Sequence, residues 1–257
     1  MRGWGRFYRT SVELGLRYLA RHGYLREAVI RVVVPLDPSR YLELPETLRE
    51  LGAKAGERVL DLASPKLLAV VVARGGAEVV SVDQLEAEID AWQKLTAAET
   101  RLSFQVADGR ELPFEDASFD HAYSVSVLEH IPEPGDEAAL RELARVTKPG
   151  GRVVVTLPYA PEYREDWRDA PVYAEQAAGE RHFFQRWYDR ARLERFAAAA
   201  PDLELVSSST SRLQPNLNAL YTRTFPLLVP FGPLFGLLAS RREGPDGDVV
   251  RLTFRHR

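Results

Sequence analysis

The sequence predicts an α/β protein built on an open, mostly parallel sheet, and three observations predict it. Apolar runs of strand length alternate along the chain with stretches of helical length. The first run, Arg58–Leu62, is apolar at nearly every position, which is typical of a strand buried on both faces of a parallel sheet. The next run ends at Asp83, an acid about 20 residues after Asp61, which is the spacing of a nucleotide-binding βαβ unit.

The amino-terminal part of the chain favours helices. Thr10–Val29 places apolar residues along one helical face and basic residues along another. We interpret the basic face as solvated, in preference to a surface for an anionic ligand or a membrane. Pro35–Pro38 predicts a turn, and Leu44–Leu51 predicts a short helix that stops at Gly52. Residues 1–52 are therefore expected to form an amino-terminal helical cap.

From Arg58 onward, strands and helices alternate. The crossover helix Lys66–Arg74 is apolar almost all round and is expected to be well buried. The later strands are expected at Glu78–Val82, Leu102–Val106, Phe119–Val125, Arg152–Leu157, Leu203–Arg212 and Asp248–Arg255. The later helices are expected at Leu85–Ala98, Glu137–Val146 and Gln185–Ala199, with a sharp turn at Lys148–Gly151. Right-handed crossovers between such strands give one open sheet, which places residues 53–257 in one main domain.

Two insertions interrupt this pattern. Residues 158–186 mix aromatic and charged side chains after a sheet strand. Two interpretations are equally supported: the segment forms one wall of a ligand site, or it is a surface loop that its aromatic residues anchor to the domain. Residues 213–247 contain the apolar run Phe225–Ala239, whose three prolines exclude a straight helix. Burial inside the protein or in a homodimer is favoured for this run. Arg241 and Arg242 beside it keep peripheral membrane contact open.

Composition excludes several classes of function. The formal net charge is −3, which argues against a nucleic-acid partner. The chain has no cysteine, so disulfides, thiolate metal sites and cysteine nucleophiles are excluded. The five histidines show no HExxH spacing, so we expect no metal site. No apolar run reaches the roughly 20 residues of a membrane span, and residues 1–23 lack the apolar stretch of a signal peptide, so we expect a cytoplasmic protein.

Five motifs follow one another in the core, at Arg58–Leu62, Val79–Gln84, Val106–Phe114, Phe119–Ile131 and Val146–Leu157. In this order and spacing the chain resembles the class I S-adenosylmethionine-dependent methyltransferases, in particular the small-molecule, methyltransferase type 11-like branch. The resemblance implies a Rossmann-like sheet of seven strands, the last antiparallel, with helices on both faces. It also implies S-adenosylmethionine as cofactor and methyl transfer to an O or N atom of a small-molecule acceptor.

The resemblance further implies roles for individual residues. Asp61 would orient the turn that holds the methionine part of the cofactor, and Asp83 would accept hydrogen bonds from both ribose hydroxyls. Asp108 and the backbone of Gly109 would meet the adenine. The other expected cofactor contacts are Ala63, Ser64, Gln84, Ser124 and Val125. A helix cap at Asp83 and a simple turn at Asp108 are the plainer interpretations of single residues, but five ordered motifs favour the cofactor.

The acceptor side has fewer candidates. His130, just after the Phe119–Val125 strand, is the best-placed general base for an acceptor that must lose a proton, although a packing role for this histidine is the plainer interpretation. Contacts with the acceptor are expected at Tyr41, Tyr159, Trp167 and His182.

The first turn departs from the family pattern. A glycine-rich turn lets the backbone approach the cofactor, whereas Ala63 and Ser64 add side chains here and Pro65 removes an N–H donor. Either the Ser64 hydroxyl replaces a backbone donor, or the protein is an inactive relative that binds or assembles. We favour cofactor binding. A lipid or membrane-surface methyltransferase is a third hypothesis, and the missing glycine fingerprint makes a dinucleotide oxidoreductase the least supported.

Overall fold

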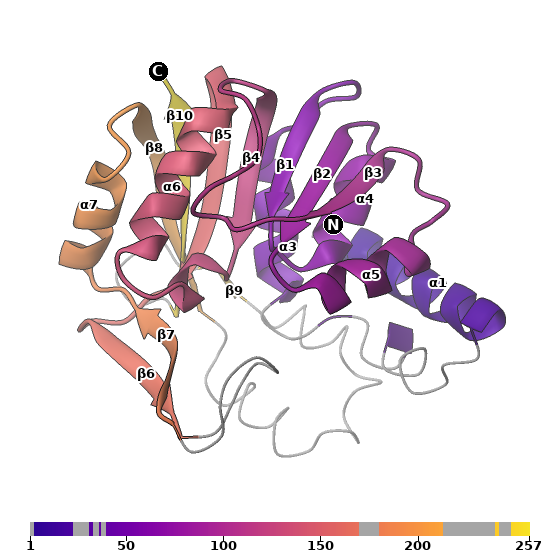
Figure 1. Cartoon of the computed structure of the whole chain (residues 1–257), viewed down its shortest axis with the longest axis horizontal. Helices are drawn as coiled ribbons and strands as arrows, with labels where there is room; N and C mark the ends of the chain where they lie inside the picture. The colour runs from indigo at the N-terminus through magenta and orange to yellow at the C-terminus, as the bar shows by residue number, and fades with distance from the viewer. Residues whose placement is uncertain are drawn as a thin grey trace.

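The structure is a computed structural model that describes residues 3–22, 31–32, 36, 40–169, 180–212, 240–241 and 248–257. It consists of one large sheet with helices on both faces and a small hairpin beside it (Figure 1). The strands of the large sheet are β1 (Arg58–Leu62), β2 (Glu78–Asp83), β3 (Leu102–Val106), β4 (Phe119–Val125), β5 (Thr147–Pro158), β8 (Leu203–Arg212), β9 (Ser240–Arg241) and β10 (Val249–His256). The helices are α1 (Trp4–His22), α3 (Arg40–Leu51), α4 (Lys66–Arg74), α5 (Glu86–Leu95), α6 (Gly135–Val146), α7 (Arg190–Ala198) and the 3₁₀ turn η1 (Leu128–His130).

The sheet confirms the predicted topology. Its strand order is β3-β2-β1-β4-β5-β10-β8-β9. The first five strands pair in parallel, and β10 lies antiparallel between β5 and β8. The seven expected strands are all present, and the two-residue strand β9 is added at the β8 edge. The chain order reverses between β1 and β4, and ligands of open α/β sheets bind at such a point.

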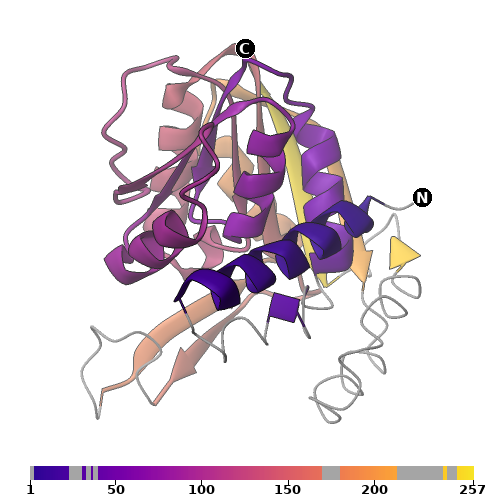
Figure 2. The ribbon, with the colours of Figure 1, turned by 90° about the vertical axis from the view of Figure 1, so that its right-hand side faces the viewer.

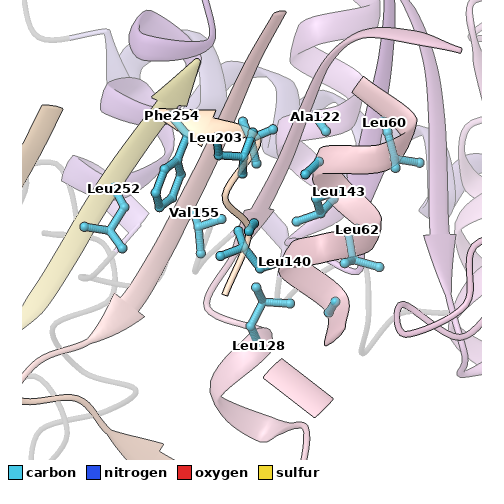
Figure 3. Close-up of a cluster of buried hydrophobic side chains, with 14 of the residues drawn as sticks. Leu60, Leu62, Ala122, Leu128, Leu140, Leu143, Val155, Leu203, Leu252 and Phe254 are labelled. Carbon is cyan, nitrogen blue, oxygen red and sulfur yellow. The ribbon is translucent and has the colours of Figure 1, made fainter. Parts of the chain in front are cut away.

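Helices cover the two faces of the sheet because successive strand residues point to opposite sides. In β4, Ala122 packs with α6 and α7, while Tyr123 and Val125 pack with α1, α3, α4 and α5. Figure 3 shows the first of these clusters, where Leu140 and Leu143 of α6 meet the sheet. On the other face, the indigo helix α1 crosses beside α3 and α4 (Figure 2).

The structure corrects one expected helix. Only the second half of Gln185–Ala199 is helical, because α7 begins at Arg190 and the Asp189 carboxylate caps it by accepting from the Arg192 N–H at 2.8 Å. The residues before it form strand β7 (His182–Trp187), which pairs antiparallel with β6 (Arg164–Arg168). The first insertion therefore contains a hairpin, and residues 170–179 between its strands lie outside the described residues.

Several element boundaries also differ from expectation. Helix α1 starts at Trp4 instead of Thr10, and residues 23–29 lie outside the described part. Helix α3 starts at Arg40, four residues before the expected Leu44. The expected turn Lys148–Gly151 is part of β5, where the pairing with β4 is irregular. A Cβ at Gly151 would lie 2.3 Å from the Asp120 carbonyl oxygen, so only glycine allows these two strands to approach there.

The second insertion, 213–247, falls almost entirely outside the described residues, and so does the apolar run Phe225–Ala239. The division at residue 52 and the insertion boundaries stay predictions. Within the described ranges, no helix combines the length and the apolar character that crossing a membrane requires.

Candidate functional site

The turn after β1 is held from inside the sheet by Asp61. This side chain is fully buried, and its two carboxylate oxygens accept from the Ser64 N–H at 3.2 Å and from the Ser81 hydroxyl at 2.6 Å. Burial raises the pKa of Asp61, and the positive charge of Lys66 opposes that rise. Asp61 therefore holds the turn from inside the sheet, and its role toward a cofactor stays a prediction.

The backbone of the turn has an uncommon conformation. Ala63 has φ of +52°, a left-handed value that usually favours glycine, and its N–H donates to the Val82 carbonyl at 2.8 Å. The Ser64 hydroxyl accepts from the Val125 N–H at 3.0 Å and points its proton to the Leu62 carbonyl at 3.4 Å. That proton is therefore used within the protein, which does not support the idea that the Ser64 hydroxyl replaces a missing backbone donor.

Asp83 stands at the carboxyl end of β2 and is 7% exposed. One oxygen accepts from the Leu85 N–H at 3.1 Å, and the other lies 3.0 Å from the ammonium of Lys66. Lys66 is the first residue of α4, and its side chain is 2% exposed. No role is expected for Lys66 from the sequence, because the conformation of a long, flexible side chain leaves no signal in the amino-acid pattern.

Asp108 and Gly109 follow β3. The Asp108 carboxylate faces the guanidinium of Arg110 and accepts from Nε at 3.0 Å and from Nη2 at 2.6 Å. This interaction lowers the pKa of Asp108. A Cβ at Gly109 would lie 2.9 Å from a methyl group of Leu62, so the backbone packs directly against the end of β1.

Two adjoining cavities open at this edge of the sheet. The Asp108 cavity, of about 680 Å³, is lined by Ala63, Asp83, Gln84, Asp108, Gly109, Val127 and His130, among others. The Lys66 cavity, of about 560 Å³, is lined by residues that include Arg31, Arg40, Ser64, Lys66, Trp92 and Val125. Ala63, Asp83, Leu85 and Ser126 line both cavities, so Asp83 stands at their junction. Both volumes are within the range of about 300–1,000 Å³ that is typical of small-molecule sites.

Some predicted residues lie elsewhere. Ser124 is fully buried and donates to the Leu62 carbonyl at 3.1 Å, so it lies behind the cavity lining and does not face the cavity. Ser126 takes its place at the cavity, because the chain turns there with φ of +52°. Tyr41 is 1% exposed and packs against Trp4 in the core. Tyr159 lines a third cavity, beside α7 and β8.

Trp167 and His182 lie on the β6–β7 hairpin, whose Phe184 carbonyl contacts His130 at the Asp108 cavity. Trp167 is 43% exposed and stacks edge-on against Phe183. Neither residue lines either site cavity. Their contact with an acceptor stays a prediction.

His130 lines the Asp108 cavity with a defined tautomer. Its Nδ1 lies 2.6 Å from the carbonyl oxygen of Phe184, and a carbonyl can only accept, so Nδ1 carries the proton. The other nitrogen, Nε2, therefore has the lone pair. Burial lowers the pKa of His130, which favours the neutral ring at pH 7. His130 thus lines the cavity with an unprotonated Nε2, which lies 3.9 Å from the buried carboxyl of Glu129.

Glu129 is a buried acid beside the site. It lies within the Phe119–Ile131 motif, but the motif alone predicts no role for its side chain. Its side chain is 2% exposed, and Oε2 makes no hydrogen bond with any described residue. Burial raises the pKa of Glu129 to about 8, and the nearby Glu43 adds to the rise. Glu43 in turn accepts from the Ser126 hydroxyl at 2.7 Å and from Thr156, which fastens α3 to the ends of β4 and β5.

Glu129→Gln tests whether this carboxyl is neutral in the folded protein. A folded pKa of about 8 against an ordinary value of 4.5 means that the native state holds an extra proton between these two pH values. The contribution of Glu129 to stability is therefore full below pH 4.5 and is lost as the pH rises through about 8. We expect the difference in melting temperature, variant minus wild type, to increase from pH 5 to 8 and then to stay constant.

The measurement is thermal unfolding across pH 5–9, with Glu204→Gln on an exposed position of β8 as the matched control. A difference between wild type and Glu129→Gln that does not change with pH would show that Glu129 is already ionised at neutral pH.

The fold and the site together define an open α/β protein, with its cavity at the carboxyl edge of a parallel sheet and at the point where strand order reverses. The sequence profile of a known family, described as a methyltransferase domain, matches residues 60–155. The match runs from β1 into β5 and covers less than half of the chain, so this central part is similar in sequence to a methyltransferase domain.

Relatives with curated names share the central part of the chain. A demethylmenaquinone methyltransferase of Clavibacter sepedonicus is 39% identical over 110 residues, which cover 42% of this chain and 44% of the relative. A 27-O-demethylrifamycin SV methyltransferase of Amycolatopsis mediterranei is 31% identical over 141 residues, or 52% and 49% of the two chains. The chain thus spans about half the length of the curated relatives it matches, or less.

Solved structures share the fold over a longer stretch. A geranyl diphosphate methyltransferase in complex with SAM superposes with a TM-score of 0.58 at 14% identity and covers 92% of this chain and 91% of its own. The [4+2]-cyclase SpnF superposes with a TM-score of 0.55 at 18% identity and covers 83% and 79%. At these identities the similarity establishes the fold alone.

Proposed function

We propose that this protein transfers a methyl group from S-adenosylmethionine to an O or N atom of a small-molecule acceptor. The observation that carries the proposal is the position of Asp83, a carboxylate at the end of β2 where two cavities join. The names of the relatives support the same reaction class, since both those described above are methyltransferases. The acceptor itself stays undefined.

The residues of the Asp108 cavity fit the nucleoside part of the cofactor. The Asp83 carboxylate can accept two hydrogen bonds, which suits the paired hydroxyls of a ribose. Asp108 and the side-chain-free backbone at Gly109 provide a polar rim for the adenine, while Val127 and Ile131 offer apolar surface. Gln84 lines the same cavity, and Ala63 lies between the nucleoside side and the Lys66 cavity.

The bound cofactor would supply an electrophilic methyl group on a sulfonium ion. The chain's own residues then have to align the acceptor with that methyl group and exclude water. His130 is suited to take up a proton from the acceptor, because its ring is neutral and its Nε2 lone pair is free of the Phe184 hydrogen bond. An acceptor that loses no proton would not need His130.

A second function is favoured by one specific observation. Asp83 is already paired with a buried lysine, and the donors of the turn are used inside the protein. This arrangement also suits an inactive relative that acts as a binding or assembly protein. The homodimer and peripheral-membrane hypotheses depend on residues 225–239, which lie outside the described part, and stay predictions.

Isothermal titration calorimetry with S-adenosylmethionine and S-adenosylhomocysteine separates the two functions. We expect saturable binding of both ligands with a dissociation constant below about 1 mM, the upper end of the range in which enzymes usually bind substrates. No heat of binding at millimolar ligand, from protein that unfolds cooperatively in a thermal scan, would contradict the methyltransferase proposal and favour the inactive relative.

A further inference from the structure

The turn between β1 and α4 has no hydrogen-bond donor left for a ligand at residues 63–65. The Ala63 N–H donates to the Val82 carbonyl, and the Ser64 N–H donates to Asp61. Pro65 has no N–H, and the Ser64 hydroxyl donates to the Leu62 carbonyl. A negatively charged ligand group above this turn would have to be held by something else.

Lys66 is the nearest cation to that turn along the chain and lines the same cavity. Its ammonium lies 3.0 Å from Asp83 and close enough to Asp61 to lower the pKa of that acid. With the Lys66 side chain only 2% exposed, its charge is costly to bury unless a carboxylate accompanies it. Lys66 therefore needs an anionic partner at all times.

We propose that Lys66 anchors the amino-acid carboxylate of the cofactor. This inference rests on the proposed function. As the ribose hydroxyls donate to Asp83, the ammonium moves from Asp83 to the carboxylate of the cofactor. Neither charge is left unpaired by the exchange, because Asp83 gains two hydroxyl donors while Lys66 replaces one carboxylate with another. The ammonium of Lys66 thus binds the carboxylate, because residues 63–65 of the turn have no free amide that could do so.

The test compares two ligands that differ in the amino-acid part. S-adenosylhomocysteine carries the carboxylate, whereas 5′-deoxy-5′-methylthioadenosine has the same nucleoside and thioether without it. For Lys66→Met we expect calorimetry to show S-adenosylhomocysteine binding weakened by about 10- to 100-fold, the value of a charge-assisted hydrogen bond. Binding of methylthioadenosine should stay unchanged or improve, since Asp83 no longer has a competing partner.

Two further variants keep the result interpretable. Lys66→Gln retains a donor for Asp83 and repeats the comparison if Lys66→Met unfolds. Lys94→Met removes an exposed lysine at the end of α5 and should leave both affinities at the wild-type value.

Each other outcome overturns the inference in a recognisable way. Equal losses for both ligands would mean that Lys66 acts only on the nucleoside side, through Asp83. Equal gains would mean that Lys66 only competes with the ribose for Asp83. A wild-type protein that binds neither ligand would overturn the proposed function itself, and the inference with it.

Discussion

Asp83→Asn is expected to weaken the binding of S-adenosylhomocysteine by about 100-fold. The amide keeps the shape of the carboxylate but has no charge, and two hydrogen bonds to a charged group are worth at least about 3 kcal/mol together. The same change leaves the buried ammonium of Lys66 opposite a neutral group. We therefore also expect a lower melting temperature, with the cooperative transition retained. Calorimetry and thermal unfolding measure the two effects.

The matched control is Asp90→Asn, which changes an exposed aspartate on α5 in the same way. Its affinity and melting temperature should equal those of the wild type. An unchanged affinity in Asp83→Asn would mean that the ribose assignment is wrong, whatever happens to stability.

The second large effect concerns the cluster that holds the hairpin against η1. Asp136 is fully buried at the start of α6 and contacts Arg186 of β7 at 2.5 Å, Arg192 of α7 at 2.9 Å and the Tyr188 hydroxyl at 2.8 Å. Asp136→Asn is expected to lower the free energy of unfolding by about 3–5 kcal/mol, because the buried Arg186 loses its carboxylate. The melting temperature should fall by roughly 6–20 °C.

Urea denaturation gives the free energy, and Asp202→Asn, at an exposed position before β8, is the control. A loss of less than about 1 kcal/mol, the size of a surface ion pair, would show that the cluster is not a stability element. Arg186 also donates to the Ile131 carbonyl at 2.8 Å, next to His130. Loosening the cluster should therefore disturb the hydrogen bond that sets the His130 tautomer.

The sequence predicted the sheet well, because its strands carry their own signals. Strands β1, β3, β4 and β8 and helix α4 have the expected boundaries, and in β1 and α4 the signal is a nearly continuous apolar run. Strand β7 overlaps the start of the expected helix Gln185–Ala199, because its pairing with β6 leaves no local periodicity. The start of α3 was likewise set by contacts of Glu43 with β4 and β5.

The site was predictable as far as the backbone decides it. Acids at the ends of parallel strands must meet at one edge, and Asp83 and Asp108 do line one cavity there. The direction of single side chains could not be predicted. Ser124 faces the interior and Ser126 the cavity because of a left-handed turn, and the Lys66–Asp83 pair depends on how a flexible side chain folds back.

The central claim is that Asp83 and Lys66 hold an S-adenosylmethionine-type ligand at the junction of the two cavities. A crystal structure of the protein with S-adenosylhomocysteine tests it most directly. We expect both ribose hydroxyls within hydrogen-bonding distance of Asp83 and the carboxylate of the ligand on the Lys66 ammonium. A ligand whose ribose lies away from Asp83, or cavities without ligand after soaking at millimolar concentration, would contradict it.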